Sequence, residues 1–145
     1  MVVTKDDYEI DDDTARLDLD VVHGFVVASY WAEGVPRDVV ERSVAGSLNL
    51  GLYHGGSQVG FTRVVTDRAT FAWVADVFVL PDHRGRGLGH WMIETMLAHP
   101  DLAGLRRFVL VTSDAHQVYA DCGFVPLAEP GRYMEITRPA RDLYR

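Results

Sequence analysis

The feature that most constrains this chain is a strand that runs straight into a glycine-rich turn and then into a helix. β-branched and aromatic residues dominate from Phe71 to Leu80, and Pro81 then ends the strand because proline cannot donate a ladder hydrogen bond. Apolar residues at helical spacing follow, at Leu88, Met92 and Met96. The glycines therefore lie where a strand passes into a helix.

Such a turn is suited to binding an anion. The first N–H groups of a helix have no partner within it, the helix dipole favours negative charge, and glycines let a ligand approach the main chain. Arginines and a histidine add positive charge to the same stretch of an otherwise acidic chain. The pattern predicts phosphate binding, although a tight loop with solvated arginines would use the same residue types. The predicted binding residues are Arg84, Gly85, Arg86, Gly87, Leu88, Gly89 and His90.

Two common phosphate loops do not match. Counted from Gly85 and Gly87, the dinucleotide fingerprint requires a third glycine where this chain has His90. The nucleoside-triphosphate loop requires a lysine, and no lysine follows Lys5. A dinucleotide-dependent reductase is accordingly disfavoured.

The spacing Arg-x-x-Gly-x-Gly, at Arg84, Gly87 and Gly89, resembles the coenzyme A loop of the GNAT superfamily of acyl-CoA-dependent N-acyltransferases. A second stretch, Val118–Phe124, resembles the family landmark Tyr-x-x-x-Gly-Phe. The resemblance is specific from about residue 71 to residue 124 and weaker before that. It implies an α/β fold with a mostly antiparallel mixed sheet, splayed at the cofactor strand and flanked by about four helices.

The remaining sequence is consistent with one domain spanning residues 1–145. Residues 8–13 suggest an edge strand or a solvated arm. We expect helices that begin near Asp20 and Pro36, a hairpin of strands at 48–53 and 58–66, a strand at 107–112 and a helix capped by Asp114 that carries His116 and Tyr119. A closing pair of strands is expected at Val125–Leu127 and Tyr133–Ile136.

The composition of the chain argues against several classes of binding partner. A formal net charge of −7 argues against nonspecific binding to nucleic acid or to an anionic membrane. The single cysteine, Cys122, cannot form an internal disulfide, and the histidines lack ligand spacing, so no metal is predicted. No apolar run is long enough for a signal peptide or a membrane span, and we expect a cytoplasmic protein. The family resemblance also suggests a homodimer.

Moving an acetyl group from a thioester to an amine requires an uncharged nitrogen, a polarised carbonyl and a proton for the leaving thiolate. The resemblance implies that main-chain N–H groups at Phe78 and Val79, with Val77 beside them, contact the cofactor. It also implies that Tyr119 is the general acid, since an ordinary phenol with a pKa of about 10 is protonated at neutral pH. The alternative is a packed tyrosine whose hydroxyl bonds a nearby carbonyl.

The general base that takes the proton of the attacking amine is less clearly indicated by the sequence. Several family members carry a glutamate on the strand before the loop, whereas Asp76 is the only acid in that strand here. Asp76 could act in catalysis, hold a turn, or pair with an arginine such as Arg63. His116 is a rival base or a contact to the pantetheine arm, and a water chain is a third choice. Asp114 stands near the place of a cofactor-contacting asparagine in many members.

The resemblance places the first two helices beside the acceptor cleft, and Tyr30 and Trp31 are our candidates for lining it, unless they are ordinary core aromatics. The predicted function is transfer of an acetyl group from acetyl-CoA to a primary amine of a small molecule or peptide by direct attack. A noncatalytic acyl-CoA sensor is the alternative. The identity of the amine and the range of acyl groups are not encoded in any recognisable motif.

Overall fold

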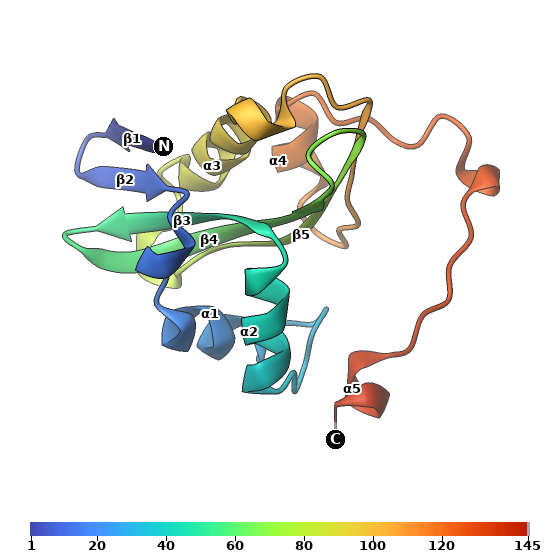
Figure 1. The fold of residues 1–145 in the computed structure, drawn as a ribbon, viewed down its shortest axis with the longest axis horizontal. Helices are drawn as coiled ribbons and strands as arrows, with labels where there is room; N and C mark the ends of the chain where they lie inside the picture. Colours follow the sequence, from blue (N-terminus) through green and yellow to red (C-terminus); the bar gives the residue numbers. More distant parts are fainter. Residues whose placement is uncertain (145) are drawn as a thin grey trace.

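The computed structural model describes residues 1–144, in which one six-stranded sheet runs between helices on both faces (Figure 1). The strands lie in chain order across the sheet, and all neighbouring pairs are antiparallel except the last, which is parallel. This confirms the predicted mixed sheet. Its strands are β1 (Val2–Lys5), β2 (Tyr8–Asp11), β3 (Leu48–His54), β4 (Ser57–Thr66), β5 (Phe71–Val79) and β6 (Arg107–Val109).

Residues 8–13 were expected as an edge strand or a solvated arm, but β2 within them is the second strand in and β1 forms the edge. The sequence of β1 is short and mostly exposed, so it lacks the alternation of buried residues that would mark a strand. In β3, Leu48–Tyr53 are all buried, because helices cover both faces of the sheet there.

Helices α1 (Leu19–Val26) and α2 (Arg37–Ala45) cover one face of the sheet, while α3 (Leu88–Leu97) and α4 (His116–Asp121) cover the other (Figure 1). Two separate apolar clusters fill these layers, one around Met92, Ile93 and Met96 and one around Val22 and Phe61. The N-cap of α1 is Asp18, whose carboxylate accepts from the amides of Asp20 and Val21, so the helix begins earlier than expected. A short α5 (Ala140–Leu143) ends the described chain.

The sheet opens between β5 and β6. These strands pair only from Phe71 and Arg107 to Trp73 and Val109, and β5 then continues alone on that side to Val79. On its other side, the register with β4 shifts between Arg63 and Val64. The predicted splay at the strand before the glycine turn is therefore present.

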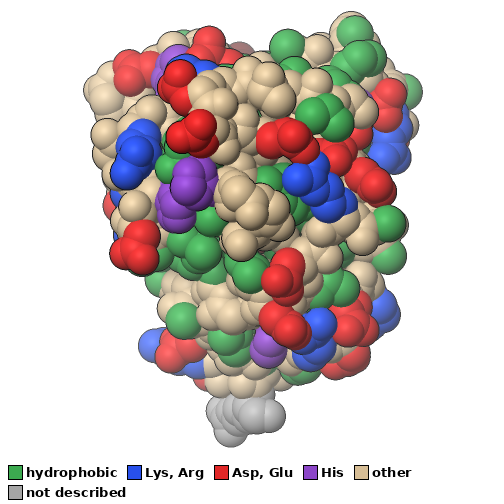
Figure 2. Space-filling model, turned by 90° about the vertical axis from the view of Figure 1, so that its left-hand side faces the viewer, with side chains coloured by type: hydrophobic (Ala, Val, Ile, Leu, Met, Phe, Trp, Pro, Cys, Tyr) green, Lys and Arg blue, Asp and Glu red, His purple; other side chains and the backbone are tan. Residues whose placement is uncertain are grey.

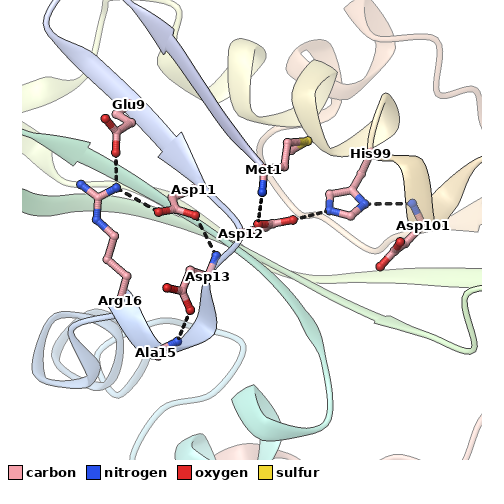
Figure 3. A network of polar contacts seen from close by, with 9 residues as sticks. All are labelled: Met1, Glu9, Asp11, Asp12, Asp13, Ala15, Arg16, His99 and Asp101. Carbon is pink, nitrogen blue, oxygen red and sulfur yellow. Dashed lines mark hydrogen bonds and ion pairs between the residues drawn. The ribbon is translucent and has the colours of Figure 1, made fainter.

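A polar network ties the amino-terminal strands to the end of α3 (Figure 3). His99, buried at 4% exposure, donates from Nε2 to Asp12 (2.8 Å) and accepts the amide of Asp101 at Nδ1 (3.0 Å). Burial alone would raise the pKa of Asp12, but hydrogen bonds from the terminal ammonium and His99 outweigh it, so the pKa is lowered.

The closing pair of strands predicted at Val125–Leu127 and Tyr133–Ile136 is wrong: neither segment is a strand. Residues 125–139 instead form an exposed arm that stands off the body of the molecule between α4 and α5 (Figure 1). A strand exists only with a paired neighbour, and the arm finds none within its own described chain.

The face shown in Figure 2 mixes acidic and basic side chains, and no continuous basic patch gathers on it among the described residues. None of the helices in residues 1–144 is long and apolar enough to cross a bilayer. Within the same residues, no group of three potential metal-ligating side chains comes together.

Candidate functional site

The glycine-rich turn forms one wall of a cavity of about 260 Å³. Gly85 and Gly87 have positive φ angles of 79° and 74°, which other residues adopt only with strain. Gly87 is the N-cap of α3, and no side chain caps that helix end. A Cβ atom added at Gly85, Gly87 or Gly89 would meet nothing within 4 Å, so the glycines leave open space above the helix start. The cavity is lined by Val79, His83, Arg84, Gly85, Gly87, Leu88, Gly89, His90, Val118 and Asp121.

The predicted cationic side chains take different positions around this turn. Arg84 donates from Nε to the carbonyl of Val79 (2.9 Å), which ties the turn to the end of β5. His90 lies 2.7 Å from Glu94 one helical turn later, and Arg86 does not line the cavity as the described residues define it. Of the predicted cationic side chains, Arg84 and His90 therefore line the cavity beside the glycine backbone.

A second cavity, of about 490 Å³, lies between α1 and α2 on one side and β5 and α4 on the other. Among the predicted residues, it gathers Tyr30, Trp31, Asp76, Asp114 and Tyr119, from four different segments of the chain. Tyr30 and Trp31 are 58% and 37% exposed, so they are not core aromatics. Their rings contact each other edge to face, with centroids 5.1 Å apart.

Asp76 is held by two donors. Its Oδ2 accepts from Arg63 Nε at 2.6 Å, and its Oδ1 accepts from the Trp31 indole at 2.8 Å. Only 6% of Asp76 is exposed. The arginine partner anticipated from the sequence is therefore present, and both carboxylate oxygens are engaged. Arg63 in turn donates to Ser47 (3.1 Å).

Tyr119 lies on α4 with its ring edge to face against Phe124, at 5.7 Å between centroids. Burial raises the pKa of Tyr119 to about 12, and the nearby Tyr30 and Asp114 act in the same direction. The phenol is therefore neutral, and able to donate a proton, across the physiological range. No hydrogen bond to a neighbouring carbonyl is present for this hydroxyl among the described residues.

The backbone of β5 presents two residues to the gap in the sheet. The amide of Leu80 donates to Val59 of β4 (2.8 Å), and alternate residues of a strand face the same neighbour. Phe78, two residues earlier, therefore also turns its N–H toward β4. Val77 and Val79 turn theirs toward the gap. The backbone N–H groups that face the gap are therefore those of Val77 and Val79, whereas the expected pair was Phe78 and Val79.

The two cavities lie along the same two elements. On β5, Val77 lines the larger cavity and Val79 the smaller; on α4, Tyr119 lines the larger and Val118 the smaller. His116, at the start of α4, lines neither among the described residues. Sequence reasoning missed His83, whose Nδ1 lies 2.8 Å from the Tyr8 hydroxyl, because no motif marks that position.

The comparisons with known proteins agree with this geometry. The sequence matches the family described as "Acetyltransferase (GNAT) domain" over residues 46–126, more than half of the chain. A protein of the fungus Gibberella zeae is 30% identical over 139 residues, covering 80% of this chain and 77% of its own, and is described as a "putative acetyltransferase". Both comparisons include the glycine turn and β5.

Solved structures extend the match to the fold. A crystal structure from Xanthomonas campestris, described as a GNAT-family protein, is 44% identical and superposes with a TM-score of 0.90, covering 94% of this chain and 96% of that one. A Clostridium acetobutylicum structure determined with acetyl-CoA is 13% identical and has a TM-score of 0.66, covering 94% of this chain and 96% of that one. On the family match, the relatives and the fold together, this chain belongs to the GNAT family of acetyltransferases.

Proposed function

We propose that this protein transfers an acetyl group from acetyl-CoA to the amine of a small molecule or peptide. Support comes from family membership and from two fold neighbours whose structures contain the cofactor. One is the Clostridium protein with acetyl-CoA; the other is N-acetylglutamate synthase of Neisseria gonorrhoeae with coenzyme A and N-acetyl-glutamate, 16% identical with a TM-score of 0.67 over 88% of this chain and 30% of that one. The observation that carries the proposal is the pair of neighbouring cavities, one at the glycine turn and one that Asp76 and Tyr119 line.

The residues present fit coenzyme A. The open space above Gly85, Gly87 and Gly89 suits a diphosphate at the N-terminus of α3, where unpaired amides point outward. The gap between β5 and β6 suits an extended amide-bearing arm, because the N–H groups of Val77 and Val79 face it. When bound, the cofactor supplies a thioester, whose carbonyl carbon is the site of attack.

Within the larger cavity, the chain's own groups meet the demands of the reaction. The amide facing the gap at Val77 is placed to donate to the thioester carbonyl oxygen as negative charge develops on it. The Tyr119 phenol, neutral up to about pH 12, donates its proton to the departing thiolate. Tyr30 and Trp31 line the side from which an acceptor enters.

Asp76 fits a positioning role better than that of a free base. With Oδ1 and Oδ2 both accepting from donors, it fixes the Trp31 indole at the cavity wall. The proton of the attacking amine then leaves through water in the cavity. This assignment predicts that the rate rises with pH as the acceptor amine becomes neutral.

The engagement of Asp76 is also the observation that favours the second candidate, an acyl-CoA sensor without catalysis. A thiol-release assay with acetyl-CoA, run over polyamines, amino acids, aminoglycosides and peptides, separates the two. Amine-dependent release of free thiol supports the transferase. Tight acetyl-CoA binding without release for any acceptor supports the sensor.

The matched variants are Tyr119→Phe and Tyr53→Phe. Tyr53 is buried on β3, lines neither cavity and serves as the control. Loss of a general acid typically lowers kcat by about 100-fold or more. We expect that loss for Tyr119→Phe with KM for acetyl-CoA nearly unchanged, and wild-type rates for Tyr53→Phe. Equal rates for all three proteins would remove Tyr119 from the mechanism.

A further inference from the structure

The larger cavity of the candidate site has an aromatic lining. The face of an aromatic ring carries partial negative charge, so it attracts cations as well as apolar groups. Only Tyr119 among these rings has a part in the proposed chemistry, and the others are available to recognise the acceptor. The lining rings are Tyr30, Trp31, Trp73, Tyr119 and Tyr144.

Tyr30 and Trp31 form a right-angled corner in this lining. Their ring planes lie at 83° to each other, with centroids 5.1 Å apart, and both rings are exposed. A cation placed in such a corner contacts two rings at once, as in the aromatic cages that bind quaternary ammonium groups. The corner is therefore suited to a positively charged group of a ligand.

Both rings of the corner are held in place although they are exposed. The Trp31 indole donates to Asp76 (2.8 Å), and the Tyr30 hydroxyl accepts from the amide of Ser113 (3.2 Å). The ring of Phe25, which packs against the apolar cluster beneath, lies 6.3 Å from that of Trp31. Side chains that are fixed before a ligand arrives lose less conformational entropy when it binds. The corner is thus preorganised for binding.

Among the described residues that line the cavity, the charged side chains leave one negative charge uncompensated. Arg63 and Asp76 neutralise each other across 2.6 Å, whereas Asp114 forms no ion pair within the described chain. Asp114 follows Ser113, whose amide holds the Tyr30 hydroxyl, so the carboxylate belongs to the segment that meets the corner. Asp114 lines the larger cavity and not the one at the glycine turn, which places it on the acceptor side.

An acceptor that carries a carboxylate does not fit this lining. Arg63 is the only cation in it among the described residues, and both Asp76 and Ser47 already accept from Arg63. A bound carboxylate would face Asp114 without a partner for its own charge, and an unpaired charge taken out of water is costly. A protonated amine at the same place would instead be attracted by the carboxylate and by both ring faces.

Given the proposed function, on which this rests, we propose that the acceptor is a small aliphatic diamine. One nitrogen stays protonated and is held by Tyr30, Trp31 and Asp114, while the other is neutral and reacts. The neutral nitrogen forms the amide bond as the carbon–sulfur bond breaks, the Tyr119 phenol protonates the thiolate, and the proton released by the nitrogen returns to Tyr119 through water. The cavity volume of about 490 Å³ is that of an ordinary small-molecule site.

The first test measures binding without catalysis, by NMR titration of choline and of its uncharged carbon isostere dimethylbutanol in the absence of cofactor. We expect choline to bind about tenfold more tightly than the isostere, and Asp114→Asn and Tyr30→Leu each to weaken choline binding about tenfold.

The matched control is Asp7→Asn, which removes the same charge at the exposed turn between β1 and β2, outside both cavities. It should bind choline like the wild type, and circular dichroism checks that each variant is folded. Equal affinity for the two probes, or choline binding that neither cavity variant weakens, would overturn the proposal.

The second test compares three acceptors of equal chain length in the thiol-release assay: a pentane with an amine at both ends, pentylamine, and pentanoate with a terminal amine. We expect kcat/KM for the diamine to exceed that for pentylamine about tenfold and the amino acid to be poorest. Asp114→Lys should invert the order of the diamine and the amino acid, because the new cation attracts the carboxylate.

The outcomes separate this proposal from the proposed function. Equal kcat/KM for the three acceptors would support the transferase and overturn the diamine. Thiol release from none of them, with choline still bound at the corner, would overturn the transferase and support the cation site on its own.

Discussion

At the scale of single residues, Asp76 shows how one side chain serves structure and site together. Its carboxylate is buried and joins Arg63 on β4 to Trp31 in the segment after α1. The ion pair with Arg63 therefore joins two neighbouring strands of the sheet. The hydrogen bond from the Trp31 indole holds a side chain at the wall of the larger cavity. Any substitution at Asp76 changes both.

Asp76→Asn should destabilise the protein strongly. It leaves the Arg63 guanidinium buried without a charged partner, and breaking a buried pair from one side costs about 3–5 kcal/mol. Urea denaturation measures the loss. Replacing both partners, as in Arg63→Met/Asp76→Leu, should recover much of it, because a buried pair can be exchanged for apolar residues of similar size at little cost.

Activity in the stable double variant then separates the roles of Asp76. If Asp76 only positions Trp31, kcat falls modestly, KM for the acceptor rises and the pH profile keeps its shape. Disappearance of the ascending limb of the pH profile would instead make Asp76 the base.

Tyr53 gives a prediction in alkaline solution. Its hydroxyl is buried without a hydrogen-bond partner among the described residues, and burial raises the pKa of Tyr53 to about 12. Above an unfolded-state pKa of about 10, the unfolded chain releases this proton and the folded chain keeps it, so stability falls as pH rises from 10 to 12. Tyr53→Phe should flatten that fall and leave stability at pH 7 equal or greater by about 1 kcal/mol.

Urea midpoints measured at pH 7, 10 and 11 check this expectation. Tyr119→Phe is the comparison, since its phenol is shifted in the same direction. An unchanged slope between pH 10 and 11 in both variants would contradict the assigned burial of the two phenols.

Residue-level prediction from the sequence succeeded where a chemical reason was local. A lone acid in an apolar strand indicated a partner, and Arg63 is that partner. The Trp31 indole could not be foreseen as the second donor, because the two residues are 45 positions apart and meet only through the packing of α1 against the sheet. His83 could not be predicted for the same reason, because its partner Tyr8 lies on β2, far away in the sequence.

At the scale of elements, the turn between β5 and α3 is where sequence and structure agree most closely. Proline, positive-φ glycines and the helical spacing that follows are local signals, and they place both ends of the turn. The closing strands failed because strand formation depends on a neighbour, which no local pattern supplies. β6 was also shorter than the predicted 107–112, since its pairing with β5 ends at Val109.

Gly89→Ala offers a direct test of the anion-binding turn. Gly89 lies in the first turn of α3, has no positive φ and has open space at its Cβ position, so alanine should stabilise the free protein by about 1 kcal/mol. The added methyl group should nevertheless obstruct a diphosphate above the helix start. Affinity for coenzyme A, measured by calorimetry, is expected to fall at least tenfold.

The matched control is Gly24→Ala in α1, which also has open space at Cβ and lines neither cavity. It should bring a similar gain in thermal stability without a change in affinity. Weakened binding in the control, or full affinity in Gly89→Ala, would show that coenzyme A does not bind at this turn.

At the scale of the whole molecule, the family resemblance predicted the layered mixed sheet and its opening, and the structure contains both. The paired helices on each face follow from two separate apolar clusters that the sequence distributes among distant segments. The position of the arm could not be predicted, because residues 125–139 form no strand and no local pattern fixes their path.

Coenzyme A should stabilise the fold as a whole. A ligand present at about 100 times its Kd, and bound only by the folded chain, adds about 2.7 kcal/mol. Hydrogen exchange should localise the effect, with slower exchange at the amides of Val77 and Val79 and no change at Phe78, which already faces β4. Uniform protection along β5, or none, would show that the ligand does not occupy the gap.

The separation of the two cavities carries a consequence for steady-state turnover. On the proposed function, the glycine turn and the β5 edge would contact parts of coenzyme A that are identical before and after the acyl group departs, and only the larger cavity would contact the acyl end. The affinity of the protein for free coenzyme A should therefore be nearly equal to its affinity for acetyl-CoA. We therefore expect free coenzyme A to compete with acetyl-CoA for the same site and to inhibit the enzyme as it accumulates.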